Sequence, residues 1–157
     1  MWRNVDTSVV NWYDGSMLKG HKNTNQQGNA GVGVAIGCFA TLGFTVSIPL
    51  NDSQDYDLIF DDGKLRKVQV KTTYYKNKYD RYQLSLTIKG GNNAKAGKIK
   101  RFDTAGVDFL FVVTETDKYL IPTSFLGKGL RTGLVLGDKY ERFRLTEEWP
   151  SGLRRQP

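Results

Sequence analysis

Three polar residues near the middle of the chain have the types and spacing that phosphodiester hydrolysis requires. Asp57 opens a short apolar segment, and Gln69 and Lys71 lie in the next one, beyond an Asp-Asp-Gly turn. Side chains two residues apart in a strand point to the same face, so Gln69 and Lys71 would lie side by side. A hairpin between the two segments would bring Asp57 beside them. A carboxylate, an amide oxygen and an ammonium group would then converge on one point.

Each of these groups has a task in the hydrolysis of a phosphate ester. A carboxylate binds Mg²⁺, which prefers oxygen ligands and keeps several of its waters. The ion polarises the phosphoryl oxygen and activates water, and a lysine stabilises the attacking hydroxide and the charge developing on phosphorus. The predicted metal ligands are the Asp57 carboxylate, the Gln69 side chain and the Val70 carbonyl. Mn²⁺ is expected to substitute for Mg²⁺.

The elements that must position these residues begin with a helix. Apolar residues at helical spacing predict a helix over residues 28–42, ended by Gly43. Four glycines inside it, Gly28, Gly31, Gly33 and Gly37, each weaken the helix by up to about 1 kcal/mol relative to alanine. Such a composition indicates that a strand, a partner helix or a ligand backbone packs very closely against the helix.

A set of strands should follow this helix. Alternating or continuously apolar segments bounded by turn residues predict strands over residues 44–48, 56–60, 65–75, 82–88, 108–114, 119–121 and 140–145. Residues 123–126 are expected to form a short turn. The pattern indicates an α/β (α+β) fold with residues 1–157 in a single domain. Residues 1–27 would form an N-terminal arm and residues 146–157 a C-terminal tail.

Composition limits the class of protein. The chain has 157 residues, of which 39% are hydrophobic, so it can bury a core without cross-links. It has one cysteine and one histidine, which excludes an internal disulfide and a Cys/His zinc site. Neither a signal peptide nor an apolar stretch of the roughly 20 residues needed to span a membrane is visible. We expect a soluble cytoplasmic protein.

Positive charge is concentrated in one part of the chain. Residues 64–101 contain twelve Lys and Arg and a single acid, Asp80, whereas the whole chain carries a net charge of +7. Tyrosines are interleaved with these cations, an arrangement that suits contacts to phosphates, sugars and bases. The predicted DNA-binding residues are Lys76, Lys78, Arg81, Lys95, Lys98, Lys100 and Arg101. The alternative is a solvated edge hairpin that lysines protect against aggregation.

The segment that contains Asp57, Gln69 and Lys71 also resembles a known family, the PD-(D/E)xK nucleases. More narrowly, the chain is similar to the small homing endonucleases with a restriction fold that are encoded in bacterial group I introns. The resemblance runs from about residue 24 to residue 122. The motifs that carry it are Gly28-x-x-Gly31, Gly43-Phe44-x-Val46, Pro49-Leu50, Tyr56-Asp57-Leu58-Ile59, Gln69-Val70-Lys71-Thr72 and Tyr119-Leu120-Ile121-Pro122. It implies a restriction-endonuclease-like core, with a mixed central sheet flanked by helices.

The resemblance also implies a role for each site residue. Asp57 would be the metal-binding aspartate, Gln69 would stand at the usual glutamate position, and Lys71 would be the motif lysine. Relatives commonly carry a glutamate directly after the Gly-x-x-Gly element, where this chain has Val32. Either a further acid, Asp52 or Asp55, then assists Asp57, or the chain is catalytically impaired.

The expected function is site-specific, metal-dependent cleavage of double-stranded DNA, of the homing-endonuclease type. One active site cuts one strand, so a homo-oligomer, a dimer or tetramer, is expected, associated with the nucleoid when DNA is bound. The alternatives are a DNA-binding protein with impaired catalysis and a nuclease selective for Holliday-type junctions. Each site residue has a structural alternative as well. Asp57 could cap a turn, Gln69 could be a hydrogen-bonding strand residue, and Lys71 could be one more lysine of the basic face.

Overall fold

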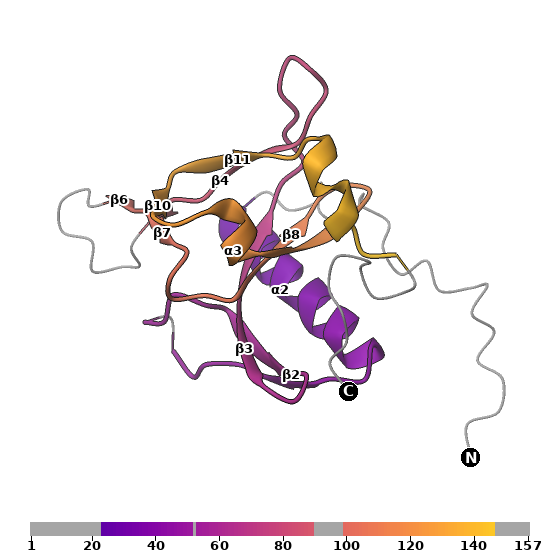
Figure 1. Ribbon diagram of the computed structural model, residues 1–157, viewed down its shortest axis with the longest axis vertical. Coiled ribbons are helices and arrows are strands. Elements are labelled where there is room, and N and C mark those ends of the chain that lie inside the picture. Colours follow the sequence, from indigo (N-terminus) through magenta and orange to yellow (C-terminus); the bar gives the residue numbers. More distant parts are fainter. Residues whose placement is uncertain (1–22, 52, 90–98, 147–157) are drawn as a thin grey trace, which may run out of the picture.

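A mixed five-stranded sheet forms the centre of the protein (Figure 1). The computed structural model describes residues 23–51, 53–89 and 99–146. The strand order is β1-β2-β3-β8-β9, and all neighbours are antiparallel except β3 and β8, which are parallel. The bounds of the strands are β1 Thr45–Ser47, β2 Leu58–Asp61, β3 Leu65–Thr72, β8 Phe109–Val113 and β9 Lys118–Pro122. The first three strands form the meander that the sequence predicted.

One long helix, α2 (Thr24–Thr41), lies along one face of the sheet (Figure 1). It begins four residues earlier than predicted because the Asn23 side chain caps it, accepting a hydrogen bond from the Asn25 amide at 2.8 Å. The sequence predicts that residues 24–27 belong to the N-terminal arm, but they form the first turn of this helix. The remainder of the arm, residues 1–22, and residues 147–157 of the tail lie outside the described residues.

Two apolar cores lie on opposite faces of the sheet. On the α2 side, Phe39 stacks on Phe60 with ring centroids 4.4 Å apart and also meets Phe111 at 5.5 Å. On the other side, Leu110 and Val112 of β8 join a second core. Strand β8 is buried on both faces, as its continuous apolar sequence predicted. Alternate residues of the sheet thus belong to different cores, which decides where each site residue points.

Smaller strand pairs cover the second core. Strands β4 (Gln83–Ser85) and β11 (Gly133–Val135) pair as a two-stranded ribbon, whose Leu84 and Leu134 pack into that core. Two shorter pairs are β5 (Ile88–Lys89) with β6 (Ile99–Lys100), and β7 (Phe102–Asp103) with β10 (Leu130–Arg131). The short helix α3 (Thr123–Leu126) follows β9, at the place where a turn was predicted.

The prediction of a last strand over residues 140–145 is wrong. Residues Asp138–Phe143 form the 3₁₀ helix η2, and strand-like pairing is limited to an isolated bridge between Tyr119 and Arg144. The two buried residues of this segment, Tyr140 and Phe143, are three apart, and a 3₁₀ helix aligns residues at that spacing on one side. None of the helices in the described ranges has the length and apolarity that crossing a bilayer requires.

Candidate active site

The antiparallel register of β2 and β3 brings the three predicted catalytic residues together. Leu58 pairs with Val68, and the Asp57 amide donates to the Val68 carbonyl at 2.8 Å, which places Asp57 opposite Gln69. Leu58 and Val68 both point into the α2-side core. Because strand side chains alternate, Asp57, Gln69 and Lys71 emerge on the opposite face of the sheet. The predicted convergence of the three residues is what the register produces.

The Asp57 carboxylate is tied closely to β3. Its Oδ2 accepts a hydrogen bond from the Val70 backbone amide at 2.6 Å and another from the Gln69 side-chain amide. The Gln69 Nε2 also lies 3.4 Å from the Val70 carbonyl oxygen, and Gln69 is buried. A donor group of Gln69 therefore lies between two oxygen atoms, one from Asp57 and one from Val70. These contacts fix the direction of the carboxylate.

Lys71 is half-buried on the same face of β3. Burial lowers the pKa of its ammonium group below the ordinary value of 10.5, and the nearby negative charge of Asp57 partly opposes that shift. A desolvated ammonium interacts more strongly with a phosphate than a fully hydrated one. The position of Lys71 beside Asp57 therefore suits stabilisation of charge on a phosphate group.

The oxygen atoms at this point are of the kind that a hard divalent cation binds. The Asp57 carboxylate and the Val70 carbonyl already share one positively polarised partner, the Gln69 amide group. The same Gln69 side chain carries an oxygen that can serve as a ligand. Among the described residues no group of three His, Cys, Asp or Glu side chains could hold a metal. Mg²⁺ is commonly held by one or two carboxylates together with substrate phosphates, so a single aspartate fits such a site.

Val32 stands where relatives commonly carry a glutamate, and its side chain lies on the α2 side of the sheet. Val32 is half-buried and packs against the α2-side core, whereas Gln69 and Lys71 emerge from the other face of β3. Strand β1 pairs with β2 only as far as Ile59, so the sheet has an edge beside Asp57. Asp55, the other acid considered, is half-buried, and Asp52 lies outside the described residues.

The close packing predicted from the helix glycines occurs at one of them. A Cβ atom added to Gly31 would overlap the Thr72 hydroxyl oxygen and would lie 3.6 Å from Val70 Cγ1. Gly28, Gly33 and Gly37 have open space within 4 Å, so the prediction is wrong for these three. The close approach at Gly31 matters for the site because Thr72 directly follows Lys71 on β3.

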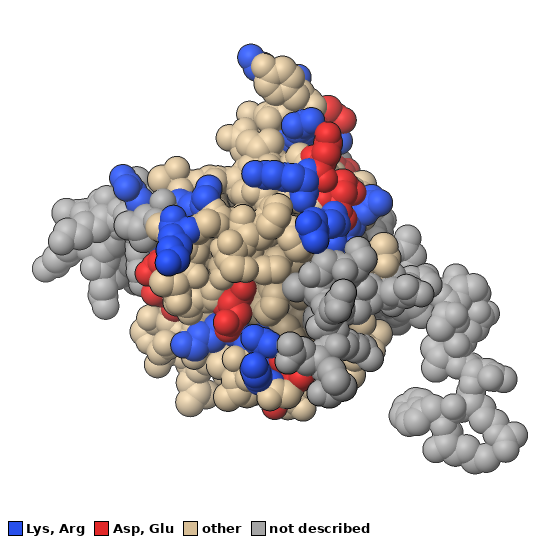
Figure 2. All heavy atoms as spheres, in the orientation of Figure 1, with Lys and Arg blue, Asp and Glu red and all other residues tan. Residues whose placement is uncertain are grey.

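The predicted DNA-binding residues fall into two groups. Lys76, Lys78 and Arg81 belong to the hairpin of residues 76–82, closed by a bridge between residues 76 and 82, which projects from the body (Figure 1). Exposed Arg101 precedes β7, and the backbone of Lys100 lies in β6. Lys95 and Lys98 lie outside the described residues. Figure 2 shows Lys and Arg side chains on the hairpin and over the body down to its lower edge, with Asp and Glu side chains among them.

Sequence reasoning missed how the hairpin cations are paired. Lys76 lies 3.0 Å from Asp80, which raises the pKa of its ammonium group, and its charge also lies over the Tyr82 ring. Arg81 lies 3.5 Å from Asp138, far along the chain. These pairs are exposed and weak. They still reduce the positive charge that the hairpin offers to a polyanion.

The sequence of the chain matches a family of nucleases. A family model described as PD-(D/E)XK endonuclease matches residues 22–149. The chain belongs to the PD-(D/E)XK endonuclease family. This confirms the resemblance and its restriction-endonuclease-like fold. The protein is therefore classed with endonucleases that hydrolyse phosphodiester bonds in DNA and generally use a divalent metal ion.

A solved structure also resembles this PD-(D/E)XK protein. The bacterial homing endonuclease I-Ssp6803I is 26% identical in sequence and superimposes with a TM-score of 0.60. The similarity covers 76% of this chain and 82% of that one. No curated protein matches the chain. The structural similarity extends over most of both chains and is not confined to a local motif.

Proposed function

We propose that this PD-(D/E)XK protein is a site-specific, Mg²⁺-dependent endonuclease of double-stranded DNA, of the homing type. The observation that carries the proposal is the cluster on β2 and β3. There the Asp57 carboxylate and the Val70 carbonyl flank the Gln69 amide, with the half-buried Lys71 on the same face. The structural similarity to a homing endonuclease supports the choice of duplex DNA and of a specific site.

In this proposal each residue has a defined role. Asp57, Gln69 and the Val70 carbonyl would hold Mg²⁺, or Mn²⁺ in its place. When bound, the ion supplies Lewis-acid polarisation of the phosphate and a more acidic water. Lys71 orients the scissile phosphate and stabilises the charge that develops on it. The amide of Val70 keeps the Asp57 carboxylate directed at this point through its hydrogen bond of 2.6 Å.

Duplex cleavage by this mechanism requires two active sites. Each copy of the chain offers one cluster of the kind described, and one cluster would cut one strand. We therefore propose a homo-oligomer, a dimer or tetramer, in which symmetric copies face the two strands. Lys76, Lys78 and Arg81 on the projecting hairpin, together with Arg101 and residues 95, 98 and 100, would neutralise phosphates next to the cut.

One observation favours a second candidate, a DNA-binding protein with impaired catalysis. The site has a single carboxylate in the contacts described, and position 32 carries a valine that packs against a core. A hard dication binds more weakly when it has fewer charged ligands. The same surface would then bind duplex DNA without cutting it.

A plasmid assay separates the two candidates. Supercoiled DNA is incubated with the protein in Mg²⁺, in Mn²⁺ or in EDTA, and a Lys71→Ala variant serves as the control. The proposed enzyme converts the plasmid to nicked and linear forms only with a divalent ion, and the variant loses most of this activity. Plasmid binding without cleavage in either ion would favour the impaired protein.

A further inference from the structure

The ribbon of β4 and β11 has one face in the core and one in solvent. Its strands pair with Gln83 opposite Val135 and Ser85 opposite Gly133. These four residues are exposed, whereas Leu84 and Leu134 between them are buried. The buried leucines fix the ribbon on the second core. The exposed face is therefore held rigidly, without being used for packing among the described residues.

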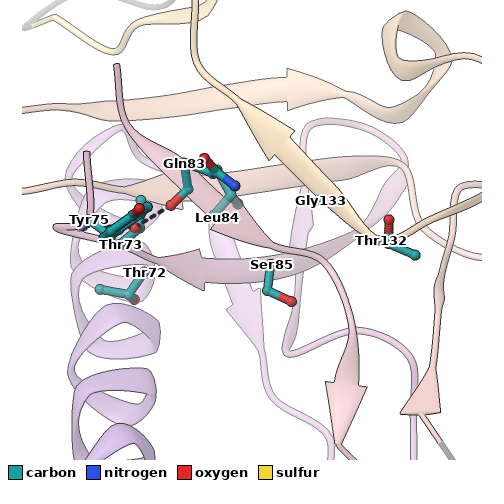
Figure 3. A pocket seen from close by; sticks show the side chains of 8 residues that line it. All are labelled: Thr72, Thr73, Tyr75, Gln83, Leu84, Ser85, Thr132 and Gly133. Atoms are coloured by element: carbon teal, nitrogen blue, oxygen red, sulfur yellow. Dashed lines mark hydrogen bonds between the residues drawn. The ribbon is translucent and has the colours of Figure 1, made fainter. Parts of the chain in front are cut away.

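The exposed face presents neutral groups that donate and accept hydrogen bonds. Gln83, Ser85 and the exposed Thr132 carry amide or hydroxyl groups, and Val135, which is 39% exposed, adds an apolar side chain. These polar residues, with Thr72, Thr73 and Tyr75, line an open groove of about 640 Å³ (Figure 3). The described side chains of the face carry no charge, although charged residues make up 25% of the whole chain.

Cationic side chains lie at both ends of this neutral face. At the end near Gln83, the Arg81 guanidinium lies against Gly137, just beyond β11, and pairs with the exposed Asp138, which a phosphate would have to displace. At the other end, Arg131 precedes Thr132 and pairs in β10 with Phe102, the residue after the exposed Arg101. Figure 2 shows Lys and Arg on either side of the region where Figure 1 places β4 and β11, with Asp and Glu beside those on the right. Cations at the ends suit phosphates, and neutral hydrogen-bonding groups between them suit base edges.

From this arrangement we infer that the exposed face of the β4–β11 ribbon enters the major groove of the DNA and reads base edges. The inference rests on the proposed function, because it names the surface that selects the site. A two-stranded ribbon fits the width of the major groove. Gln83 suits adenine, because a glutamine side chain can donate one hydrogen bond to the base edge and accept another from it. Val135 suits contact with the methyl group of thymine. The Thr132 hydroxyl, and the Ser85 hydroxyl, which also contacts the Thr87 hydroxyl at 2.7 Å, can bond to any of several base edges.

The ribbon is also tied to the strand that carries Lys71. The Thr73 hydroxyl donates to the backbone carbonyl of Gln83 at 2.7 Å, and the backbone amide of Gln83 donates to the backbone carbonyl of Tyr75 at 2.9 Å. Thr73 lies two residues after Lys71, about 7 Å along an extended chain. The bases that the ribbon reads therefore lie within a few base pairs of the scissile phosphate. A shift of either element would move recognition and cleavage together.

Selection from a randomised duplex library tests the inference. The wild-type protein, the double variant Gln83→Ala with Ser85→Ala, and Gln83→Arg are each used to enrich bound duplexes. A matched control, Thr45→Ala with Ser47→Ala, changes two exposed residues of β1, away from the ribbon. The double variant should lose discrimination on the order of 10- to 100-fold at a short run of adjacent positions. Gln83→Arg should change a preferred adenine to guanine at one of them, and the control should reproduce the wild-type consensus.

Other outcomes overturn the inference in distinguishable ways. If the wild type selects a consensus and both ribbon variants select the same one, the ribbon does not read bases, while the proposed function stands. If the ribbon variants instead change the sedimentation of the free protein and not its consensus, the face is a protein interface. If the wild type neither binds nor cuts duplex DNA, the proposed function fails and the inference fails with it.

Discussion

Gly31 lies at a close contact between α2 and β3, and its replacement by alanine should affect stability and activity together. The added methyl group would overlap the Thr72 hydroxyl, whereas it would make only an ordinary contact with Val70. Forcing an extra carbon into a packed contact costs about 1–3 kcal/mol. Gly33, two residues along the same helix, has open space around it, so Gly33→Ala carries no such cost. Both changes gain about 1 kcal/mol of helix propensity.

The difference between the two variants therefore isolates the packing term. Gly33→Ala should raise the free energy of unfolding by up to about 1 kcal/mol, and Gly31→Ala should lie about 1–3 kcal/mol below it. Thermal unfolding measures this well, since 1 kcal/mol shifts the melting temperature by about 2–4 °C in a domain of this size. Because Thr72 follows Lys71, Gly31→Ala should also slow plasmid nicking, whereas Gly33→Ala should leave it unchanged.

A double variant checks that the Thr72 hydroxyl is the group with which the alanine methyl at position 31 collides. Thr72→Ala removes the overlapping oxygen, so adding it to Gly31→Ala should recover part of the lost stability. Equal melting temperatures for Gly31→Ala and Gly33→Ala would refute the close contact. Destabilisation of Gly31→Ala with full nicking activity would show that the position of β3 at Thr72 does not control Lys71.

Three further variants test other parts of the site. Val32→Glu should lower the melting temperature without increasing nicking, because Val32 packs against the α2-side core and the added carboxylate would be partly buried there; increased nicking at low Mg²⁺ in a stable protein would show that the longer side chain reaches Asp57. Replacing Lys76, Lys78 and Arg81 by alanine should reduce the slope of log K against log salt by up to about 0.9 per phosphate contact, and an unchanged slope would place the hairpin off the DNA. Lys71→Met should abolish nicking. The variant should be at least as stable as the wild type near neutral pH, because burial lowers the Lys71 pKa. Below that lowered pKa the buried charge of the wild-type lysine destabilises the folded state. That destabilisation should disappear as pH rises from the lowered pKa toward 10.5, and a stability difference independent of pH would contradict it.

Local patterns in the sequence were sufficient to predict the candidate site. The alternation along β3 and the turn before it determine which residues share a face, and Asp57, Gln69 and Lys71 meet through these short-range rules. The continuous apolar run of β8 likewise predicted a central strand. Both signals lie within segments of a few residues.

Features that depend on distant partners could not be predicted in the same way. Strand β11 has only three residues, so its own sequence carries little strand signal, and its pairing with β4 joins segments about fifty residues apart. The pairing of Arg81 with Asp138 arises from the same long-range contact. The last segment was read as a strand from its apolar content, although the spacing of Tyr140 and Phe143 fits a 3₁₀ helix. Because β11 carries little strand signal of its own, the sequence did not predict the exposed face of the β4–β11 ribbon.

The central claim, that Asp57 holds the metal for cleavage, is tested most directly by the Mg²⁺ dependence of nicking in an Asp57→Asn variant. Asparagine has nearly the same shape, and its side-chain oxygen can still accept the Val70 amide, so the fold should be kept. Duplex binding in EDTA should also remain, because the change removes no phosphate contact. The nicking rate should fall to background at every Mg²⁺ concentration. An Asp57→Asn variant that nicks at the wild-type rate, with the same half-maximal Mg²⁺ concentration, would contradict the assignment.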